Sequence, residues 1–258
     1  MTGLNHLNRV EIIAHRGASH EAPENTLAAV NLAWQQGADA VEVDVHRTAD
    51  NEVIVIHDDS TKRTAGVRRP VAEQTLAELQ ALDAGSFRGP QWKGEKLPSF
   101  AEVLATLPAG RRLFVEVKSG PAILAPMARV LDSGGKDPGQ VVIIGFSLET
   151  MRQARQMLPG VPMCLLGSIK ARTGAGREQQ VDEWIFKARS IGMNGLDLEA
   201  GPAITAAVVK KVHQAGLKLY VWTVNHARLA VRLSAAGVDG ITTNHPGRLR
   251  QQLAAVQM

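Results

Sequence analysis

Two acidic residues, Glu42 and Asp44, alternate with valines along residues 41–46. An alternation of apolar and polar residues predicts a β-strand, and it places both carboxylates on one face of that strand. Like charges held this close repel each other unless a cation lies between them, and paired oxygens on a rigid strand suit a hard ion such as Mg2+ or Ca2+. The pair is also compatible with the solvent-exposed face of an ordinary strand.

The next segment brings a histidine back to this pair. A polar turn follows the acidic strand, and a second apolar run, residues 53–58, contains His57. Two such runs joined by a short polar turn predict a β-hairpin. A hairpin centred between Asp50 and Asn51 sets His57 opposite Asp44. The alternative is that His57 only caps the end of the hairpin.

The elements that must position these residues alternate along the chain. Apolar runs predict eight strands, at residues 10–14, 41–46, 113–118, 141–146, 162–166, 195–198, 217–224 and 240–243. Helical spacing predicts helices at residues 25–34 (N-cap Asn25), 121–131, 148–157 (N-cap Ser147), 179–190, 202–214 (Pro202 in the first turn), 227–236 and 247–255. Eight strands that alternate with helices predict a parallel (β/α)8 TIM barrel. A doubly wound sheet is the alternative, but no Gly-x-Gly-x-x-Gly turn follows the first strand.

One connection is longer than the others. Residues 47–98 exceed an ordinary connection between strand and helix, and we interpret them as the hairpin arm plus a small insertion over the barrel mouth. The tip of this insertion, residues 61–70, carries three arginines and one lysine. No linker or low-complexity tract divides the chain, so we predict a single domain over residues 1–258.

Composition narrows the classes of protein. The 258 residues are 45% hydrophobic and 21% charged, with a net charge of +4 and 4% aromatic residues, so the basic, aromatic-rich surface of a nucleic-acid binder is missing. The single cysteine, Cys164, excludes an internal disulfide and a multi-cysteine zinc site, and its apolar neighbours indicate a buried thiol. Residues 1–8 lack the apolar core of a signal peptide, and no run is long enough for a membrane span. We predict a cytoplasmic protein without membrane insertion, whose apolar helix faces permit a homodimer.

Polar residues gather where the first three barrel strands end, which is where a TIM barrel carries its active site. They are His15 and Arg16, Glu42 and Asp44, and Glu116 and Lys118. Each has a simpler interpretation, as a histidine that caps a strand or as a local ion pair. Their concentration favours a site, because inward-pointing charges destabilise a barrel unless they are paired or bound to a metal.

The chemistry indicated is metal-assisted attack on a phosphate ester. A divalent cation would act as a Lewis acid, and Arg16 and Lys118 would bind the developing negative charge. His15 and His57 would divide the proton transfers as base and acid, in an order that the sequence does not give.

Eight short segments, in order along residues 15–243, match the pattern of one known family. They are HRG at 15–17, APENT at 22–26, EVDV at 42–45, VIHD at 55–58, LPSFAE at 97–102, VEVK at 115–118, VWTVN at 221–225 and GVDGITT at 237–243. As a set they resemble the glycerophosphodiester phosphodiesterases, over nearly the whole chain.

The resemblance implies a TIM-barrel enzyme that hydrolyses deacylated phospholipids to sn-glycerol 3-phosphate and an alcohol. It implies roles for eight residues: His15 and His57 as the acid/base pair; Glu42, Asp44 and Glu116 as ligands of one divalent ion (Mg2+, Ca2+ or Mn2+); Arg16 and Lys118 as phosphate contacts; and Trp222 at the glycerol pocket. Trp222 is equally compatible with a place in the core. The chain departs from the family pattern before Pro246, where it has His245 and the family usually has an acidic or aromatic residue. We expect this to alter a rim contact and not the core chemistry. Asp197 and Glu199 also close a strand, and the resemblance gives them no role.

Two further functions stay open. A lysophospholipase D-like enzyme would use the same site on a substrate that keeps one acyl chain. It would need an apolar groove for that chain, and the insertion offers little apolar surface. A non-catalytic barrel could bind phosphodiesters, although the presence of both His15 and His57 argues against it.

Overall fold

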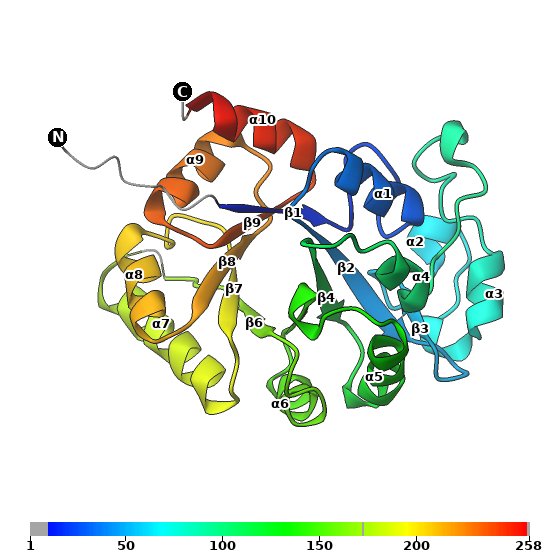
Figure 1. Cartoon of the computed structure of the whole chain (residues 1–258), viewed down its shortest axis with the longest axis horizontal. Coiled ribbons are helices and arrows are strands. Elements are labelled where there is room, and N and C mark those ends of the chain that lie inside the picture. Colours follow the sequence, from blue (N-terminus) through cyan, green and yellow to red (C-terminus); the bar gives the residue numbers. More distant parts are fainter. Residues whose placement is uncertain (1–9, 172, 257–258) are drawn as a thin grey trace.

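The structure is a computed structural model that describes residues 10–171 and 173–256. Eight parallel strands close into a barrel in the order β1-β9-β8-β7-β6-β5-β4-β2, with β2 pairing back onto β1, and helices surround it (Figure 1). The barrel strands are β1 (Glu11–His15), β2 (Ala40–Arg47), β4 (Arg112–Val117), β5 (Val141–Gly145), β6 (Met163–Gly167), β7 (Gly195–Glu199), β8 (Lys218–Trp222) and β9 (Gly240–Thr243). The predicted TIM barrel is confirmed. The predicted absence of a signal peptide in residues 1–8 concerns a segment outside the described residues.

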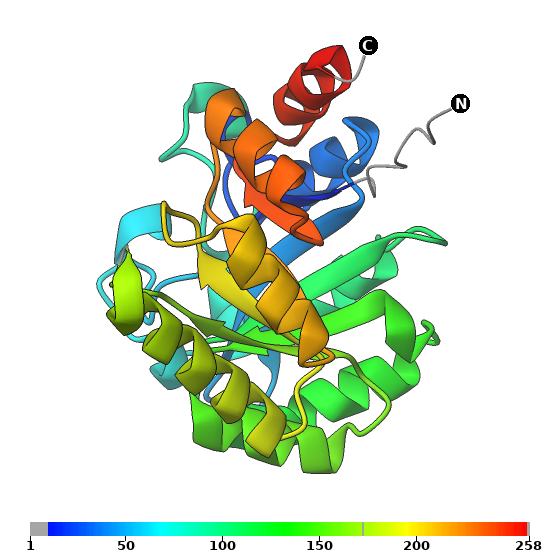
Figure 2. The ribbon, with the colours of Figure 1, turned by 90° about the vertical axis from the view of Figure 1, so that its left-hand side faces the viewer.

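The α-helices pack around the strands, and α7, α8 and α9 lie side by side on the outer surface in the view of Figure 2. Their bounds are α1 (Leu27–Gln35), α2 (Lys62–Ala65), α3 (Leu76–Ala81), α4 (Phe100–Ala105), α5 (Leu124–Ser133), α6 (Leu148–Met157), α7 (Gly174–Ser190), α8 (Ala206–Gln214), α9 (Ala227–Ala236) and α10 (Pro246–Val256). Short 3-10 helices are η1 (Val71–Glu73), η2 (Pro90–Trp92), η3 (Pro121–Ile123) and η4 (Pro138–Gln140). Over the two described ranges, no helix combines the length and apolarity that crossing a membrane requires.

Three predicted helix starts are wrong. Helix α7 begins at Gly174, five residues before the predicted start at residue 179. Thr26, not Asn25, caps α1 by accepting a hydrogen bond from the Ala29 backbone N–H. Asn25 instead adopts a positive φ of 58° and turns its side chain toward β2. Helix α8 starts after Pro202, at a cap formed by Thr205, because a threonine oxygen satisfies the free N–H groups of a first turn and proline only tolerates that position.

The hairpin forms with a register one residue away from the predicted one. Strand β3 (Val53–Val55) pairs antiparallel with β2, and the Ile56 backbone N–H donates to the Asp44 carbonyl at 3.0 Å. Ile56, not His57, therefore lies opposite Asp44. The physical reason lies in the turn, where the Thr48 hydroxyl accepts from the Glu52 N–H at 2.9 Å and centres the loop on Asp50.

The insertion has a small core of its own beside the barrel. That core consists of Ile54, Ile56, Val71, Leu79, Ala84 and Leu97. Figure 1 shows α2 and α3 next to β3, outside the ring of barrel strands. The tip is tied to the barrel by Arg63, whose guanidinium bonds Glu24 and Asp58 at 2.8 Å each. The insertion thereby holds the segment after β3, which includes His57, against the end of the barrel.

Apolar residues fill the interior of the barrel below its carboxyl end. Ile13, Ala40, Phe114, Val142, Ile144, Cys164, Leu166 and Tyr220 form one buried cluster between the strands. The free thiol of Cys164 belongs to it, as predicted. With the interior filled, the polar side chains that end the strands face a space above this cluster.

Candidate active site

A cavity of about 280 Å3 opens at the carboxyl ends of the barrel strands. Its lining residues are His15, Arg16, Glu42, His57, Glu116, Lys118, Ile144, Phe146, Leu166, Asp197, Trp222, Thr223 and Thr242. Seven of the eight residues singled out in the sequence are among them. The eighth, Asp44, is fully buried beside Glu42 and Glu116. The structure therefore brings all eight together.

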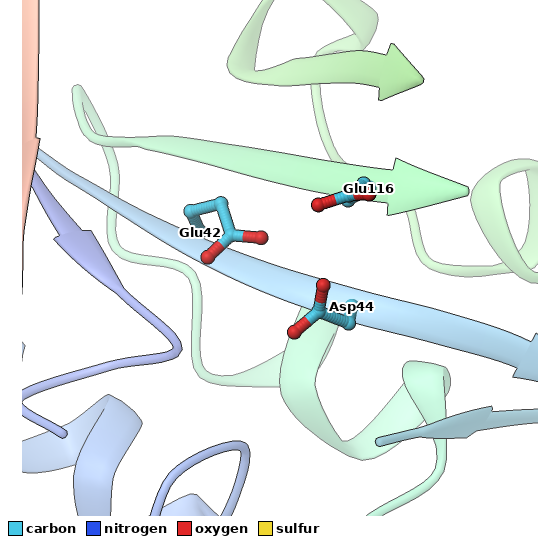
Figure 3. Close-up of side chains that lie close together, drawn as sticks. All are labelled: Glu42, Asp44 and Glu116. Carbon is cyan, nitrogen blue, oxygen red and sulfur yellow. The ribbon is translucent and has the colours of Figure 1, made fainter. Parts of the chain in front are cut away.

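Three carboxylates meet on two neighbouring strands. Glu42 and Asp44 lie two residues apart on β2, and Asp44 is in register with Glu116 on β4. One oxygen from each of the three lies within 4.8 Å of the others, and Figure 3 shows the carboxyl groups turned toward one another. Because the side-chain period of a strand is two residues, this spacing alone puts both β2 carboxylates on the inner face. We call Glu42, Asp44 and Glu116 the carboxylate trio.

The cationic side chains of the protein neutralise the carboxylate trio only in part. Burial raises the pKa of Glu42 well above its ordinary value, and repulsion by Asp44 and Glu116 raises it further. Burial and then Asp44 raise the pKa of Glu116 to about 7, although Lys118 opposes this. Oxygens Oε1 of Glu42 and Oδ1 of Asp44 are buried without a hydrogen bond. A divalent cation would supply what these oxygens lack, so the trio fits one.

Two cationic side chains border the trio. Arg16 Nε lies 3.1 Å from Asp44 Oδ2, and the Arg16 backbone N–H donates to Glu42 Oε2 at 2.9 Å. Lys118 Nζ donates to Glu116 Oε1 at 2.9 Å and lies 3.7 Å from Asp44 Oδ1. Burial disfavours the charge on Arg16, but Asp44, Glu42 and Glu24 outweigh burial and raise the pKa of Arg16. Both cations are therefore fixed where a phosphate group over the trio would need them.

Asn25 is a site residue that the sequence reasoning missed. Its Nδ2 donates to Asp44 Oδ2 at 2.9 Å, and its Oδ1 accepts from the Asp44 backbone N–H at 3.3 Å. The same loop supplies Glu24, which accepts from Arg16 at 2.9 Å. The available signal was that asparagine tolerates the left-handed conformation that Asn25 adopts, so it fits a loop that turns back onto a strand.

The two histidines that line the cavity have different partners. His15 Nδ1 lies 2.7 Å from Oδ1 of Asn244, an amide oxygen. His57 Nδ1 lies 2.7 Å from Oδ1 of Asp58, a carboxylate that Arg63 also binds. Burial, followed by the charge of Arg16, lowers the pKa of His15 to about 4. A hydrogen bond from Arg63 lowers the pKa of Asp58, and His57 adds to this effect while burial opposes it. The Asp58 carboxylate therefore stays ionised.

Comparison with known proteins agrees with this geometry. The sequence profile of the glycerophosphoryl diester phosphodiesterase family matches residues 15–248. The chain belongs to this family. Similar proteins include glycerophosphodiester phosphodiesterases of Caldanaerobacter subterraneus, 33% identical over 92% of this chain and 95% of that one, and of Bacillus subtilis, 32% identical over 93% and 85%. A phosphodiesterase of Oleispira antarctica, solved with its product sn-glycerol-3-phosphate, superposes with a TM-score of 0.83 at 27% identity, covering 95% and 96% of the two chains.

Family membership makes the chain a phosphoric diester hydrolase. The residue before Pro246, where we expect the departure from the family pattern to alter a rim contact, is His245, and its ring lies 3.9 Å from that of His20. The residue before it, Asn244, belongs to the site. Asn244 contacts His15 directly and also accepts from the Ser19 hydroxyl at 3.2 Å. Its own backbone N–H donates to Asn225 at 2.9 Å. The contacts of Asn244 with His15 and Ser19 join residues more than two hundred positions apart, so no local pattern reveals them.

The far side of the cavity is mostly apolar. Trp222 lines it and is partly exposed, and it also packs against the buried cluster in the barrel interior. The Trp222 indole N–H donates to the Asp197 carbonyl at 3.1 Å, and its ring lies edge to face with Phe146 at 5.9 Å. Ile144 and Leu166 complete this wall. The cavity therefore has one charged side and one mostly apolar side.

Proposed function

We propose that this enzyme hydrolyses glycerophosphodiesters, the deacylated forms of phospholipids, to sn-glycerol 3-phosphate and an alcohol, and that it needs a divalent cation. The observation that carries the proposal is the shared cavity, in which three carboxylates, two cations and two histidines surround one space. The product bound to the Oleispira antarctica relative supports the choice of substrate.

Glu42, Asp44 and Glu116 would hold the cation. A hard divalent ion would coordinate the buried oxygens that lack a hydrogen bond, and it would offset the repulsion that raises the pKa of Glu42 and Glu116. Mg2+, Ca2+ and Mn2+ all suit carboxylate oxygens. When bound, such an ion draws electron density from the phosphate and lowers the pKa of a nucleophile beside it. Asn25 orients Asp44 through two hydrogen bonds.

Arg16 and Lys118 would bind the phosphate oxygens. Both lie beside the trio, and each already contacts a carboxylate of it. Their charges are in place before the substrate arrives, so no reorganisation is needed as negative charge grows on the phosphoryl oxygens. Arg16 is held further by Glu24, at 2.9 Å.

His15 would act as the general base and His57 as the general acid. An amide oxygen accepts only, so Asn244 keeps the proton of neutral His15 on Nδ1 and leaves Nε2 free to take a proton from the nucleophile. The low pKa of His15 keeps this ring unprotonated at neutral pH. The Asp58 carboxylate holds His57 through Nδ1, which leaves Nε2 to carry the proton that passes to the leaving alkoxide.

Residues 1–258 would form a single catalytic domain. The insertion supplies His57, and its tip binds Glu24 on the loop after β1 through Arg63. The barrel supplies the carboxylate trio and His15. Neither part holds a complete site alone.

A matrix of metals and substrates tests the proposal. The chelated enzyme, reconstituted with Mg2+, Ca2+ or Mn2+, is assayed on glycerophosphocholine and on lysophosphatidylcholine, with release of choline, which hydrolysis of either substrate yields, as the readout. We expect metal-restored turnover of glycerophosphocholine. Preference for lysophosphatidylcholine would replace the proposal with a lysophospholipase D-like activity. Inertness with every metal would leave a barrel that only binds phosphodiesters.

A further inference from the structure

Asp197 places a buried, unpartnered carboxyl group in the cavity wall. The residue lies on β7, is 2% exposed and lines the cavity. Its Oδ1 is buried without a hydrogen bond. A polar atom buried without a partner destabilises the folded protein, so its position at a cavity indicates a ligand that supplies the missing hydrogen bond.

This carboxyl group is separate from the carboxylate trio. Strand β7 lies opposite β2 across the barrel, because three strands separate them in each direction: β6, β5 and β4 on one side, and β8, β9 and β1 on the other. Among the described residues, the group of three or more possible metal ligands that lie within 4.8 Å of one another is the trio, and Asp197 is not part of it. Asp197 therefore serves a different part of the ligand than the ion that the trio fits.

The neighbours of Asp197 are apolar. Leu166 on β6 is in register with it, and Trp222 on β8 donates its indole N–H to the Asp197 carbonyl at 3.1 Å. A single polar group in an apolar wall fixes the orientation of a ligand and contributes specificity. Burial, and then the charge of Glu116, raise the pKa of Asp197 to about 8, so the group is uncharged at neutral pH. An uncharged carboxyl group pairs with a hydroxyl group and does not attract a cation such as choline.

We propose that Asp197 binds a hydroxyl group of the glycerol unit and thereby selects glycerol-bearing diesters over other phosphodiesters. This rests on the proposed function, in which the phosphate lies against the trio, Arg16 and Lys118. From there the three-carbon unit extends across the cavity floor to β7, and its hydroxyl completes the hydrogen bonding of Asp197. The second alcohol then points to the mouth, where Phe146 is 52% exposed.

Calorimetric titration with two ligands that differ only in hydroxyl groups tests this role. The ligands are sn-glycerol 3-phosphate and n-propyl phosphate, with saturating Mg2+ or Ca2+. The proteins are the wild type, D197A, D197N and the control E199Q. Glu199 ends the same strand, but it is exposed and pairs with Lys170 at 3.1 Å, so E199Q perturbs β7 without touching the cavity.

We expect D197A to weaken glycerol 3-phosphate binding about 10- to 100-fold and to change propyl phosphate binding less than about 3-fold. D197N keeps a group that pairs with a hydroxyl, so it should restore most of the preference, and E199Q should match the wild type. The role of Asp197 is overturned if D197A weakens both ligands equally, or if the preference for glycerol 3-phosphate survives. A loss confined to phosphocholine, titrated as a third ligand, would assign Asp197 to the alcohol instead.

The titration does not depend on turnover. If the wild type fails to hydrolyse glycerophosphodiesters, the proposed function falls, while the two-ligand comparison still reports whether Asp197 reads a hydroxyl group. If the wild type hydrolyses them and D197A binds both ligands normally, only the role of Asp197 falls.

Discussion

The two ends of the barrel carry similar numbers of charged residues and treat them in opposite ways. At the amino end, a cavity of about 530 Å3 is lined by Glu11, Arg112, His213, Lys218, Tyr220, Gly237, Val238 and Asp239. Every carboxylate there is paired. Arg112 binds Glu11 and the Tyr220 hydroxyl, and Asp239 accepts from Lys218 and His213 at 2.8 Å each.

The pKa shifts show the same contrast. At the amino end, burial would raise the pKa of Asp239, but hydrogen bonds from the Leu219 N–H, Lys218 and His213 outweigh burial and lower it. At the carboxyl end, burial and like charges raise the pKa of Glu42. The larger cavity is thus electrostatically satisfied, and the smaller one is not. Unsatisfied charge, rather than cavity size or charge count, marks the site that needs a ligand.

Removing a histidine should produce the largest difference in activity between variants of the two ends. His15→Ala or His57→Ala removes a proton-transfer group, so kcat for glycerophosphocholine should fall about 100- to 10,000-fold while the melting temperature changes little. His213→Ala, at the amino end, is the matched control and should keep the wild-type kcat. Near-normal turnover in either cavity variant would reject the acid/base assignment.

Glu42→Gln should expose the conflict between stability and function at the carboxyl end. With one ligand lost, the metal concentration for half-maximal activity should rise at least about 10-fold. Metal-free Glu42→Gln should also be more stable than the metal-free wild type at pH 8. The folded-state pKa of Glu42 is raised, so both states are protonated below the ordinary pKa and the folded state loses stability as pH rises above it.

Chemical unfolding of chelated protein at pH 4 and pH 8 measures this difference. The advantage of the glutamine variant should be present at pH 8 and shrink toward pH 4. An advantage that is equal at both values would show that repacking, not charge, is responsible.

Arg112→Met, at the amino end, should have the opposite effect of Glu42→Gln: it should lower stability and leave activity nearly unchanged. It leaves Glu11 and the Tyr220 hydroxyl without their shared partner, which should lower the free energy of unfolding by about 1–3 kcal/mol. The effect stays modest because Arg112 and Glu11 are 29% and 16% exposed. Urea unfolding measures the loss, and kcat should stay within about 2-fold of the wild type. A large fall in kcat with unchanged stability would mean that the two ends are coupled.

Local patterns in the sequence were sufficient for the barrel and for the carboxylate trio. The two-residue spacing of Glu42 and Asp44 sets their common face whatever surrounds the strand, and strand–helix alternation implies that β4 brings Glu116 alongside. The position of His57 did not follow from the strand pattern alone, because the register of the hairpin depends on how Thr48 closes the turn. One bond from a side chain to the backbone shifted every pair in the hairpin.

The partners of the site residues were beyond such patterns. Asn25 reaches Asp44 across nineteen positions, and Asn244 reaches His15 across more than two hundred. The contact between Asn25 and Asp44 depends on the pairing of β1 with β2, and the contact between Asn244 and His15 on the pairing of β9 with β1. Asp197 was noticed at the end of a strand, but its lack of a partner becomes visible only when the opposite wall is in place.

Asn244→Asp sharpens the comparison within the carboxyl end, by making the partner of His15 resemble that of His57. A carboxylate next to an imidazole favours the protonated ring and raises its pKa by about 1 unit or more. A general base works only when unprotonated, so activity falls as pH falls through the pKa of His15, which is about 4. In the variant this fall should move to higher pH, seen as a shifted acidic limb of kcat/KM.

Asp58→Asn is the reciprocal change, because it takes the carboxylate away from His57. A general acid works only when it is protonated. A carboxylate next to an imidazole stabilises the protonated ring, and the variant lacks this carboxylate, so the alkaline limb of kcat/KM should move to lower pH. The two variants together decide the order of the proton transfers. If Asn244→Asp moved the alkaline limb and Asp58→Asn the acidic one, His57 would be the base and His15 the acid.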